Sequence, residues 1–345
     1  MICVFRADSS LTLGSGHVVR CLTLADALKS RGCQVFFVIQ NLAGEMSQYI
    51  QSRGYEFFKI PDHAGNLNAD AQATKSLLQA GGIRPDWLII DHYQIGIEWE
   101  SYLRDQTHRI AVIDDLADRS HDCDLLLDQN TADNRYSLLI SRHSLQLLGP
   151  SYALLRTDFH RYRQQGLCRK EALRNLLIFF SGSDATQETR KSLTAVIGSS
   201  LSIQNIHVVI GSNYPDPQGL HTLCRRFPHI QLHTQVPHMA QLMYEADVAL
   251  GSFGAATWER CSVGLPVVGT VLADNQVMPA KIVTDQDAGL NLGRAADVNG
   301  QAYVDALKSL SSDRLNEISK KSAQLVDGKG TERVVAHLIT LGDRK

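Results

Sequence analysis

Two successive series of strand-like apolar runs, separated by helical patterns, constrain the fold of this chain most strongly. The first series comprises residues 2–8, 34–40, 55–60, 87–91, 110–114 and 125–127. The second comprises residues 175–180, 206–210, 230–232, 248–250 and 266–271, with helical patterns at 186–197 and 239–246 between them. Such alternation is typical of parallel sheets covered by helices. It predicts an α/β chain with two doubly wound, Rossmann-like domains.

The domain boundaries follow from length and local polarity. At 345 residues the chain is long enough for roughly two domains. The mostly polar stretch 161–174 contains Gly166 and predicts the junction, so we expect domains at 1–160 and 172–325. Two C-terminal helices, 314–326 and 331–341, are separated by Gly328-Lys329-Gly330, and the segment 326–345 could pack across both domains.

Composition excludes several classes of partner. A hydrophobic fraction of 44%, a charged fraction of 20% and a net charge of -2 give no polyanion-binding footprint, so we expect no nucleic acid partner. The seven cysteines form no C-x-x-C pair and are interpreted as reduced residues of a cytoplasmic protein. The chain begins with a strand pattern and carries no spanning apolar run or basic amphipathic helix. We therefore expect no signal peptide, no membrane partner and a monomer.

A glycine-bearing loop, Gly14-Ser15-Gly16-His17, follows the first predicted strand and opens a helix that ends near Arg31. It resembles half of a dinucleotide fingerprint, but the third glycine is replaced by Val19, and no ribose-binding acid follows the second strand. No lysine follows Gly16, which excludes a P-loop. We therefore predict no nicotinamide or flavin cofactor. His17 lies where a helix N-terminus would keep it a neutral base, and a plain tight turn is the alternative.

A second loop, Gly254-Ala255-Ala256-Thr257-Trp258-Glu259, also opens a helix and carries no lysine and no carboxylate cluster. Its backbone N–H groups and helix dipole suit a diphosphate without a metal. Glu259 could accept the two hydroxyls of a nucleotide ribose, or it could be a solvated residue favoured by the dipole. The two loops together suggest one active site assembled between two domains.

Further polar motifs follow other predicted strands, where ligands bind in open parallel sheets. Asp91 of Asp91-His92-Tyr93 could orient an imidazole or a sugar hydroxyl, whereas helix capping is the alternative for His92. Asp114-Asp115 invites a metal interpretation, but no further acid has suitable spacing, so capping or a substrate hydrogen bond is favoured. His121 and Cys123 are too isolated for a zinc site. We predict no metal site.

A last motif, Ser181-Gly182-Ser183-Asp184, follows the strand at 175–180 and precedes a helix. It could contact a phosphate or a sugar, and a plain N-cap is the alternative. The turn Asp274-Asn275-Gln276 closes the last well-defined strand and opens the next helix.

With these motifs the chain resembles the UDP-sugar hydrolases of the pseudaminic acid pathway, which are similar in turn to glycosyltransferases of the GT-B fold. The resemblance extends from residue 2 to about residue 290 and is carried by 5–10 with 14–17, 90–93, 149–156, 181–184, 257–260 and 275–276. The chain departs from the family pattern at Ser181, where glycine is frequent, and at Ser252-Phe253, where the family loop is richer in glycine.

The resemblance implies hydrolysis of UDP-2,4-diacetamido-2,4,6-trideoxy-β-L-altrose to UDP and the free sugar. It matches His17 to the family's catalytic histidine, and it implies that Arg156, Glu259 and Asn275 contact the nucleotide or the sugar. Motifs and resemblance together predict the following substrate-binding residues: Asp8, Gly14, Gly16, Asp91, Tyr93, Arg156, Ser181, Gly182, Ser183, Asp184, Gly254, Ala255, Ala256, Thr257, Glu259, Asn275 and Gln276.

The expected chemistry needs neither a metal nor a cofactor. His17 would take a proton from water that attacks the anomeric carbon, with inversion, while the N–H groups at 254–256 stabilise the departing UDP. The main alternative is a GT-B glycosyltransferase that uses the same UDP-sugar donor. A metal-dependent phosphohydrolase and a nucleotide-sugar binding protein without turnover are further alternatives.

Overall fold

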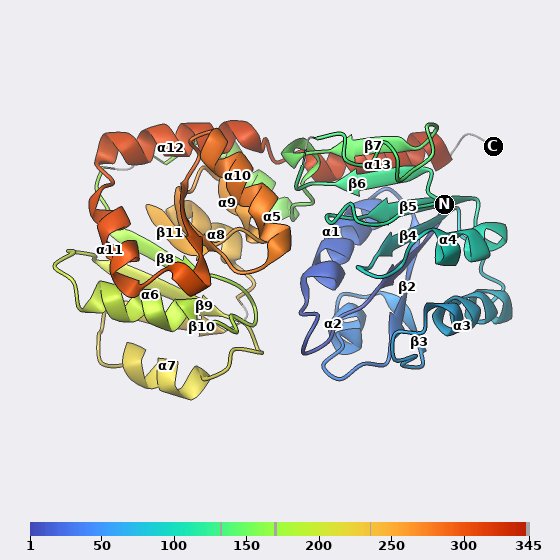
Figure 1. Ribbon diagram of the computed structural model, residues 1–345, viewed down its shortest axis with the longest axis horizontal. Coiled ribbons are helices and arrows are strands. Elements are labelled where there is room, and N and C mark those ends of the chain that lie inside the picture. The colour runs from blue at the N-terminus through green and yellow to red at the C-terminus, as the bar shows by residue number, and fades with distance from the viewer. Residues whose placement is uncertain (132, 169–170, 235, 343–345) are drawn as a thin grey trace. The chain divides into compact units, whose positions relative to one another are not determined.

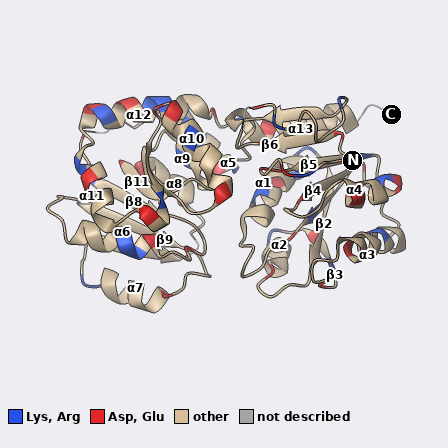
Figure 2. Ribbon diagram, in the orientation of Figure 1, with Lys and Arg blue, Asp and Glu red and all other residues tan. Residues whose placement is uncertain are grey.

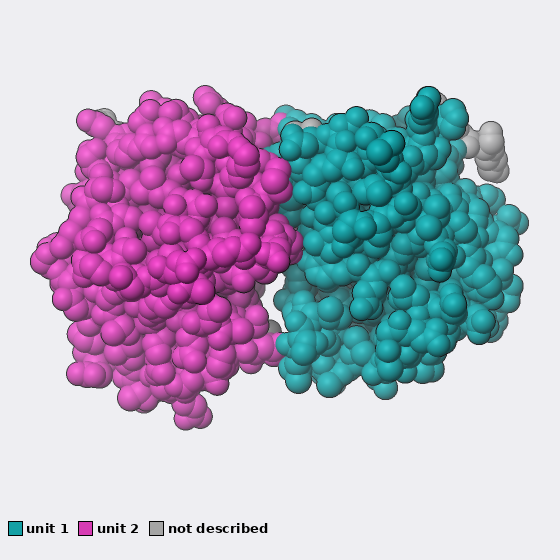
Figure 3. Space-filling view, viewed as in Figure 1, with its two compact units in different colours: residues 1–154, 329–345 teal, residues 155–328 magenta. Residues whose placement is uncertain are grey.

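The computed structural model describes residues 1–131, 133–168, 171–234 and 236–342. Its contacts divide the chain into unit 1, residues 1–154 and 329–345, and unit 2, residues 155–328 (Figure 3). Each unit contains one parallel sheet with helices on its faces (Figure 1). This confirms the predicted pair of Rossmann-like α/β domains.

The sheet of unit 1 has the strand order β3-β2-β1-β4-β5-β6-β7, and every pairing is parallel. The interior strand β1 is almost fully buried, as expected for a parallel strand covered on both faces. The strands are β1 (Ile2–Ala7), β2 (Gln34–Gln40), β3 (Glu56–Ile60), β4 (Trp87–Asp91), β5 (Arg109–Ile113), β6 (Leu125–Asp128) and β7 (Leu145–Leu148).

The helices of unit 1 bury apolar stripes on both faces of this sheet. One core packs α1 and α13 against the sheet through Leu24, Leu28, Val334 and Leu338. The opposite core includes Trp99 of α4 and Leu78 of α3. The helices are α1 (Gly16–Ser30), α2 (Ser47–Ser52), α3 (Leu67–Ala80), α4 (Ile97–Leu103) and α13 (Gly330–Gly342), with 3-10 turns at Arg104–Gln106 and Pro150–Tyr152.

The sheet of unit 2 has the order β10-β9-β8-β11-β12-β13 and is also parallel throughout. Its strands are β8 (Asn175–Phe179), β9 (Asn205–Ile210), β10 (Ile230–Thr234), β11 (Val248–Ser252), β12 (Val267–Val271) and β13 (Leu290–Arg294). Its helices are α5 (Thr157–Gln164), α6 (Glu188–Ile197), α7 (Pro217–Cys224), α8 (Met239–Glu245), α9 (Ala256–Ser262), α10 (Val277–Asp285), α11 (Gly300–Lys308) and α12 (Ser312–Leu325), with 3-10 turns at Asp274–Gln276 and Ala295–Asp297.

The structure differs from the sequence prediction at the unit boundary. The chain leaves unit 1 after Leu154, not within 161–174, because α5 packs on α8 and α9 of unit 2. The C-terminal helix α13 belongs to unit 1, where it packs against α1 and its Leu338 carbonyl accepts a hydrogen bond from Trp87 Nε1 at 2.9 Å. Of the segment 326–345, which was predicted to pack across both domains, the residues from Lys329 onward thus belong to unit 1.

Each strand order reverses direction once, and these switch points locate the polar loops. In unit 1 the switch lies between β1 and β4, which are followed by Asp8 and by His92. In unit 2 it lies between β8 and β11, which are followed by Ser181 and by Phe253. Ligands of open parallel sheets bind beyond the carboxyl ends of strands at such points. Four of the predicted motifs thus follow the four strands at the switch points.

The helices carry charged residues of both signs on their surfaces. Acidic and basic residues are interspersed in both units, as along α12 (Figure 2). Within the described ranges, no helix combines the length and the apolar character that crossing a bilayer requires.

Candidate functional site

His17 and Asp91 form the centre of the polar edge of unit 1. Asp91 is the last residue of β4 and is fully buried, and His17 is the second residue of α1 with 6% of its surface exposed. The His17 Nδ1 atom lies 2.5 Å from Asp91 Oδ1. Because an ionised carboxylate only accepts hydrogen bonds, Nδ1 carries a hydrogen atom and donates a hydrogen bond to Asp91. In the neutral tautomer that fits this contact, Nε2 is the nitrogen without a hydrogen atom.

Arg20, one helical turn after His17, binds the same carboxylate. Its Nε lies 2.5 Å from Asp91 Oδ2, its Nη2 lies 2.6 Å from Oδ1, and its Nη1 reaches Asp115 Oδ2 at 3.1 Å. Burial alone would raise the pKa of Asp91, but the charges of Arg20 and His17 outweigh it and hold that pKa well below its usual range. Asp91 is therefore a permanent carboxylate, fixed by Arg20 and directed at His17.

The sequence prediction did not include Arg20. A signal was present, because Arg20 stands three residues after His17 among the apolar residues of α1, and residues at this spacing share one helix face. The aspartate partners lie 71 and 95 residues away in the sequence, so periodicity could not identify them.

Tyr93 and the two glycines surround His17. The Tyr93 ring meets the imidazole edge-on, with centroids 4.4 Å apart and an interplanar angle of 78°. Gly14 has a φ of 75°, which favours glycine, and its N–H donates to Ser10 O at 2.9 Å. Gly16 is the first residue of α1. The tight turn and the histidine site are thus two aspects of one loop.

Asp8 lies at the same edge but is held by an internal network. It is 2% exposed, and Arg6 donates to its Oδ1 and Oδ2 atoms at 2.7 and 2.9 Å. Arg6 also pairs with Asp70 at 2.5 Å, and Trp99 Nε1 donates to the same aspartate at 2.8 Å. Burial opposes the ionised form of Asp8, yet Arg6 and His92 outweigh it and lower its pKa well below the usual range. Asp8 is therefore a buried carboxylate that stays ionised at this edge of the sheet.

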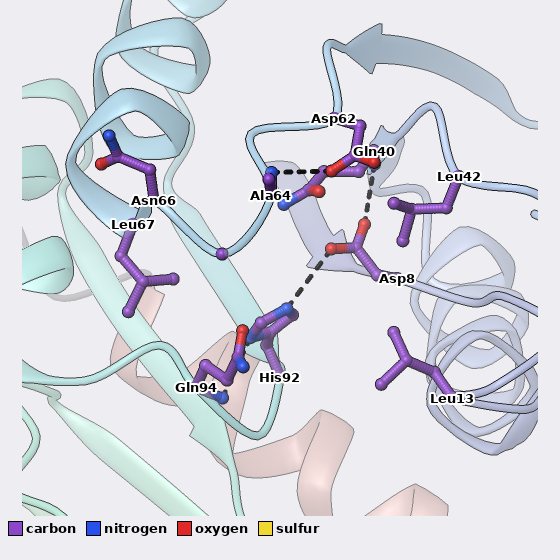
Figure 4. A pocket seen from close by; sticks show the side chains of 11 residues that line it. Asp8, Leu13, Gln40, Leu42, Asp62, Ala64, Asn66, Leu67, His92 and Gln94 are labelled. Atoms are coloured by element: carbon purple, nitrogen blue, oxygen red, sulfur yellow. Dashed lines mark hydrogen bonds and ion pairs between the residues drawn. The ribbon is translucent and has the colours of Figure 1, made fainter.

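A cavity of about 310 Å³ adjoins Asp8 (Figure 4). His92 Nδ1 accepts hydrogen bonds from the backbone N–H groups of Gln94 and Ile95 at 3.1 and 3.2 Å. Its protonated Nε2 therefore faces Asp8 Oδ2 at 3.4 Å. His92 therefore binds the turn that precedes α4, whose N-cap is Gly96, and also lines the cavity. The cavity is lined by Asp8, Leu13, Gln40, Leu42, Asp62, Ala64, Gly65, Asn66, Leu67, His92 and Gln94.

The pair Asp114-Asp115 has structural partners on the protein. Asp114 Oδ2 accepts from the Ala117 N–H at 2.8 Å and from the Tyr136 hydroxyl at 2.9 Å. Asp115 binds Arg20, as described above. Within the described ranges, no three His, Cys, Asp or Glu side chains converge as metal ligands would. No helix lies in the fully described segment between β5 and β6, so Asp114 binds the N–H groups of a turn and not those of a helix N-terminus.

In unit 2 the polar side chains of segment 181–184 bind N–H groups of the same segment and of the first turn of α6. Ser181 Oγ accepts from the Asp184 N–H at 2.7 Å, and the Asp184 carboxylate accepts from the N–H groups of Glu188 and Thr189 at 3.0 and 2.8 Å. Asp184 is fully buried, and burial raises its pKa. These contacts favour the capping alternative for Asp184. Gly182 is exposed and Ser183 is half-buried, so both stay on the accessible side of the loop.

The loop at 254–257 follows β11 and lies beside the turn after β12. Ala255 is exposed, and Gly254 and Ala256 are half-buried. Thr257 is fully buried, and its N–H donates to Gly254 O at 2.9 Å. No side chain caps α9 at Ala255.

Asn275 and Gln276 belong to that neighbouring turn. Gln276 Oε1 accepts from the Leu272 N–H at 3.0 Å, and a Cβ on Gly254 would lie 3.5 Å from Gln276 Nε2. Asn275 is half-buried beside it. The two predicted segments therefore meet at one edge of the sheet.

Glu259 and Arg156 meet within unit 2, as a pair of potential ligand contacts. Arg156 Nη2 lies 3.5 Å from Glu259 Oε1, and the two side chains are 28% and 21% exposed. Burial raises the pKa of Glu259, and the positive charge of Arg156 opposes this shift. Since both side chains stay partly accessible, each can still contact a ligand.

Three curated proteins resemble the chain at low identity. It is 25% identical to the uncharacterized protein MJ1062 of Methanocaldococcus jannaschii over 94% of its own length, and it spans 62% of that protein. It is 25% identical to the spore coat polysaccharide biosynthesis protein SpsG of Bacillus subtilis, covering 98% of both chains. It is 27% identical to UDP-2,4-diacetamido-2,4,6-trideoxy-beta-L-altropyranose hydrolase of Campylobacter jejuni, over 71% of this chain and 82% of that protein. No protein-family model matches the chain.

Solved structures agree on the fold. MurG of Acinetobacter baumannii superposes with a TM-score of 0.67 at 16% identity, covering 98% of this chain and 99% of that one. The Phytolacca americana enzyme UGT2, in complex with UDP-2-fluoro-glucose and pterostilbene, gives 0.66 at 13% identity, with coverages of 99% and 100%. The chain has the GT-B glycosyltransferase fold. This likeness concerns architecture and does not define a reaction.

Proposed function

We propose that the protein hydrolyses a UDP-linked 2,4-diacetamido-2,4,6-trideoxy-altrose to UDP and the free sugar, with His17 as the general base. The observation that carries the proposal is the arrangement of His17, Asp91 and Arg20 at the switch point of unit 1. The similarity to the Campylobacter hydrolase supports the choice of substrate.

The carboxylate behind His17 gives the imidazole one orientation and one tautomer. Asp91 accepts a hydrogen bond from Nδ1–H, so Nε2 is available to take a proton from water. When Nε2 becomes protonated, the buried negative charge of Asp91 stabilises the imidazolium. Arg20 keeps Asp91 ionised and prevents its rotation, which makes Arg20 a positioning residue.

The proposed reaction is a single displacement at the anomeric carbon. As His17 Nε2 removes a proton from water, the water oxygen bonds to the anomeric carbon and the bond from that carbon to the UDP oxygen breaks. The departing UDP takes the electron pair as negative charge on its diphosphate. Backbone N–H groups at 254–256 are available to that charge, since no side chain caps α9. The configuration at the anomeric carbon is inverted.

The nucleotide is assigned to unit 2 by the same proposal. Glu259 would accept hydrogen bonds from ribose hydroxyls, and the positive charge of Arg156, 3.5 Å from it, favours the ionised form of Glu259. Asn275 and Gln276, beside Gly254, would contact the diphosphate or the sugar. UDP is a good leaving group, so one base and one anion-binding loop suffice for this reaction.

The test is incubation of the purified protein with UDP-2,4-diacetamido-2,4,6-trideoxy-β-L-altrose in EDTA and oxygen-18 water, followed by location of the label. We expect label in the sugar and none in UDP. His17→Ala should lower the rate about 10²- to 10⁴-fold, the usual contribution of a general base. His17→Gln, which keeps a donor toward Asp91, should be equally slow while still binding UDP.

Each other outcome contradicts a definite part of the proposal. Label in UDP would mean attack at phosphorus, and loss of activity in EDTA would reveal a required metal. Unchanged turnover in both His17 variants would remove His17 as the base. No UDP release by the wild-type protein would remove the hydrolase assignment.

A glycosyltransferase that uses the same donor is the second candidate, and the cavity beside Asp8 favours it. A volume of about 310 Å³ is enough for a small acceptor. Release of UDP without any added acceptor would separate the hydrolase from this transferase.

A further inference from the structure

Arg260 is a buried arginine directly behind the loop that follows β11. Its side chain belongs to α9 and the residue is 1% exposed. Its Nη2 donates to the Ser252 carbonyl and lies 3.4 Å from Thr257 Oγ1. A Cβ on Gly251 would lie 2.9 Å from Arg260 Nη1, so glycine at this position leaves room for the guanidinium. Arg260 therefore joins both ends of segment 252–257.

The charge of Arg260 has no ion-pair partner among the described residues, at a limit of 4.0 Å between nitrogen and oxygen. The charge of Glu259 acts on Arg260 and favours its charged form, but the opposing effect of burial is larger. Its Nε atom is buried without a hydrogen-bond partner in the described part of the chain. The adjacent residue Glu259 pairs with Arg156. Burial lowers the pKa of Arg260 to about 10, which still leaves it charged at neutral pH.

Such a group is costly for a protein to keep. A buried charge loses its hydration, and an ion pair or a set of hydrogen bonds normally compensates for the loss. Here two hydrogen bonds to the loop compensate only in part. An anion that binds on the accessible side of segment 252–257 would supply the missing negative charge across a region of low dielectric constant, where such an attraction is strong.

We propose that Arg260 is a positioning residue for the diphosphate of the nucleotide ligand, which it attracts through its buried charge while its hydrogen bonds fix the loop. This inference rests on the proposed function, because it takes UDP as the ligand of unit 2. Arg260 does not touch the ligand itself. It acts through its hydrogen bonds to Ser252 and Thr257 and through the electric field of its charge.

A purely structural role makes a different prediction. If Arg260 only anchors the loop, its loss disturbs every ligand of unit 2 to a similar degree. If its charge attracts the diphosphate, its loss weakens UDP much more than uridine, which has the same base and ribose but no charge. The ratio of the uridine Kd to the UDP Kd therefore separates the two roles.

The experiment measures both dissociation constants by isothermal titration calorimetry for the wild-type protein and three variants of the full chain. Arg260→Met removes the charge and keeps much of the stem, and we expect the UDP Kd to rise about 10- to 100-fold while the uridine Kd stays near its wild-type value. Arg260→Lys retains the charge and should retain most of the preference for UDP. Arg260→Gln provides a second neutral variant if the methionine variant does not fold.

Arg163 supplies the matched control. Its Nη1 donates to the Ser262 carbonyl at 3.0 Å, at the opposite end of α9. Arg163→Met should leave the ratio unchanged. If the neutral Arg260 variants weaken uridine and UDP equally, or weaken neither, the inference is wrong. If the wild-type protein binds no UDP, the proposed function fails first, and this result is distinct from an unchanged ratio in the variants.

Discussion

Arg6 in unit 1 and Arg260 in unit 2 are both fully buried near the polar edge of their sheet, yet their surroundings differ. Arg6 pairs with Asp8 and Asp70 at 2.7 and 2.5 Å, and these charges raise its pKa despite burial. Arg260 has backbone and hydroxyl partners only, and burial lowers its pKa to about 10.

This difference indicates that the polar edges of the two sheets have different functions. In unit 1 the buried arginines Arg6 and Arg20 are each bound by two aspartates, and the contacts of Arg20 hold Asp91 against His17. In unit 2 the buried charge of Arg260 has no ion-pair partner among the described residues and is only partly compensated, which suits a site that receives an anion. A rigid arrangement favours proton transfer, and an unbalanced charge favours binding.

The largest effect should come from Asp91→Asn, which disturbs unit 1 and leaves unit 2 intact. An asparagine amide no longer enforces the Nδ1–H tautomer of His17, and it removes the charge that stabilises the imidazolium. We expect kcat for UDP release to fall about 10³- to 10⁴-fold. Steady-state kinetics at saturating substrate measures this change.

Two controls sharpen this result. The UDP Kd of Asp91→Asn should equal that of the wild type, and Asp118→Asn, at an exposed partner of Arg119, should leave kcat unchanged. A kcat within a factor of a few of the wild-type value would show that Asp91 does not act through His17.

Asp70→Asn should shift Arg6 part of the way toward the state of Arg260, because it leaves Asp8 as its one aspartate partner. Leaving a buried charge unpaired costs about 3 to 5 kcal/mol of unfolding free energy, so with Asp8 still bound we expect a loss of about 2 to 3 kcal/mol. Urea denaturation measures the loss. Asp105→Asn, at an exposed pair with Lys75, should not move the midpoint. Equal midpoints for Asp70→Asn and the wild type would mean that Arg6 does not need its carboxylates.

The pH dependence of stability tests a carboxyl group of unit 1 that lacks a strong counter-ion. Burial raises the pKa of Asp128 to about 7, above that of an unfolded chain, so the folded state holds the proton more tightly. Stability from this group is therefore complete at low pH and is lost as pH rises through about 7.

Asp128→Asn removes this pH dependence. We therefore expect the wild type to lose about 1 to 3 kcal/mol of unfolding free energy relative to the variant between pH 5 and pH 8. Urea midpoints of the two proteins at both pH values provide the measurement. A constant difference between them would contradict the raised pKa.

The smallest effect should come from Glu259→Gln in unit 2. Loss of the charged acceptor for ribose hydroxyls should raise the UDP Kd about 10-fold, since a hydrogen bond to a charged group contributes about 1.5 kcal/mol. Calorimetry measures the Kd, and kcat at saturating substrate should not change. An unaltered Kd would leave Glu259 as a partner of Arg156 alone.

Much of the fold could be predicted from the sequence because buried parallel strands form continuous apolar runs. The runs at 34–40 and 87–91 coincide with β2 and β4. The strands β7 and β13 were missed. Both are edge strands of mixed polarity, Leu-Gln-Leu-Leu and Leu-Asn-Leu-Gly-Arg, so neither gives a continuous apolar signal.

The sequence predicted which residues belong to the candidate site, but it did not predict which of them contact one another. His17, Asp91 and Tyr93 were recognised because they follow strands, and the structure brings all three together. The partners of Arg6 could not be identified, because Asp70 lies 64 residues away on a helix with no distinguishing pattern. A charged residue inside a buried strand was nevertheless a signal that such a partner exists.

The return of α13 to unit 1 has a consequence for synthesis on the ribosome. The core of unit 1 includes Val334, Val335 and Leu338, which are translated after every residue of unit 2. Unit 2 can therefore complete its own core first, while the face of α1 that receives α13 waits uncovered. Unit 1 can therefore complete its core only after α13 has been synthesised, so an intact histidine site depends on a helix that follows all of unit 2 in the sequence.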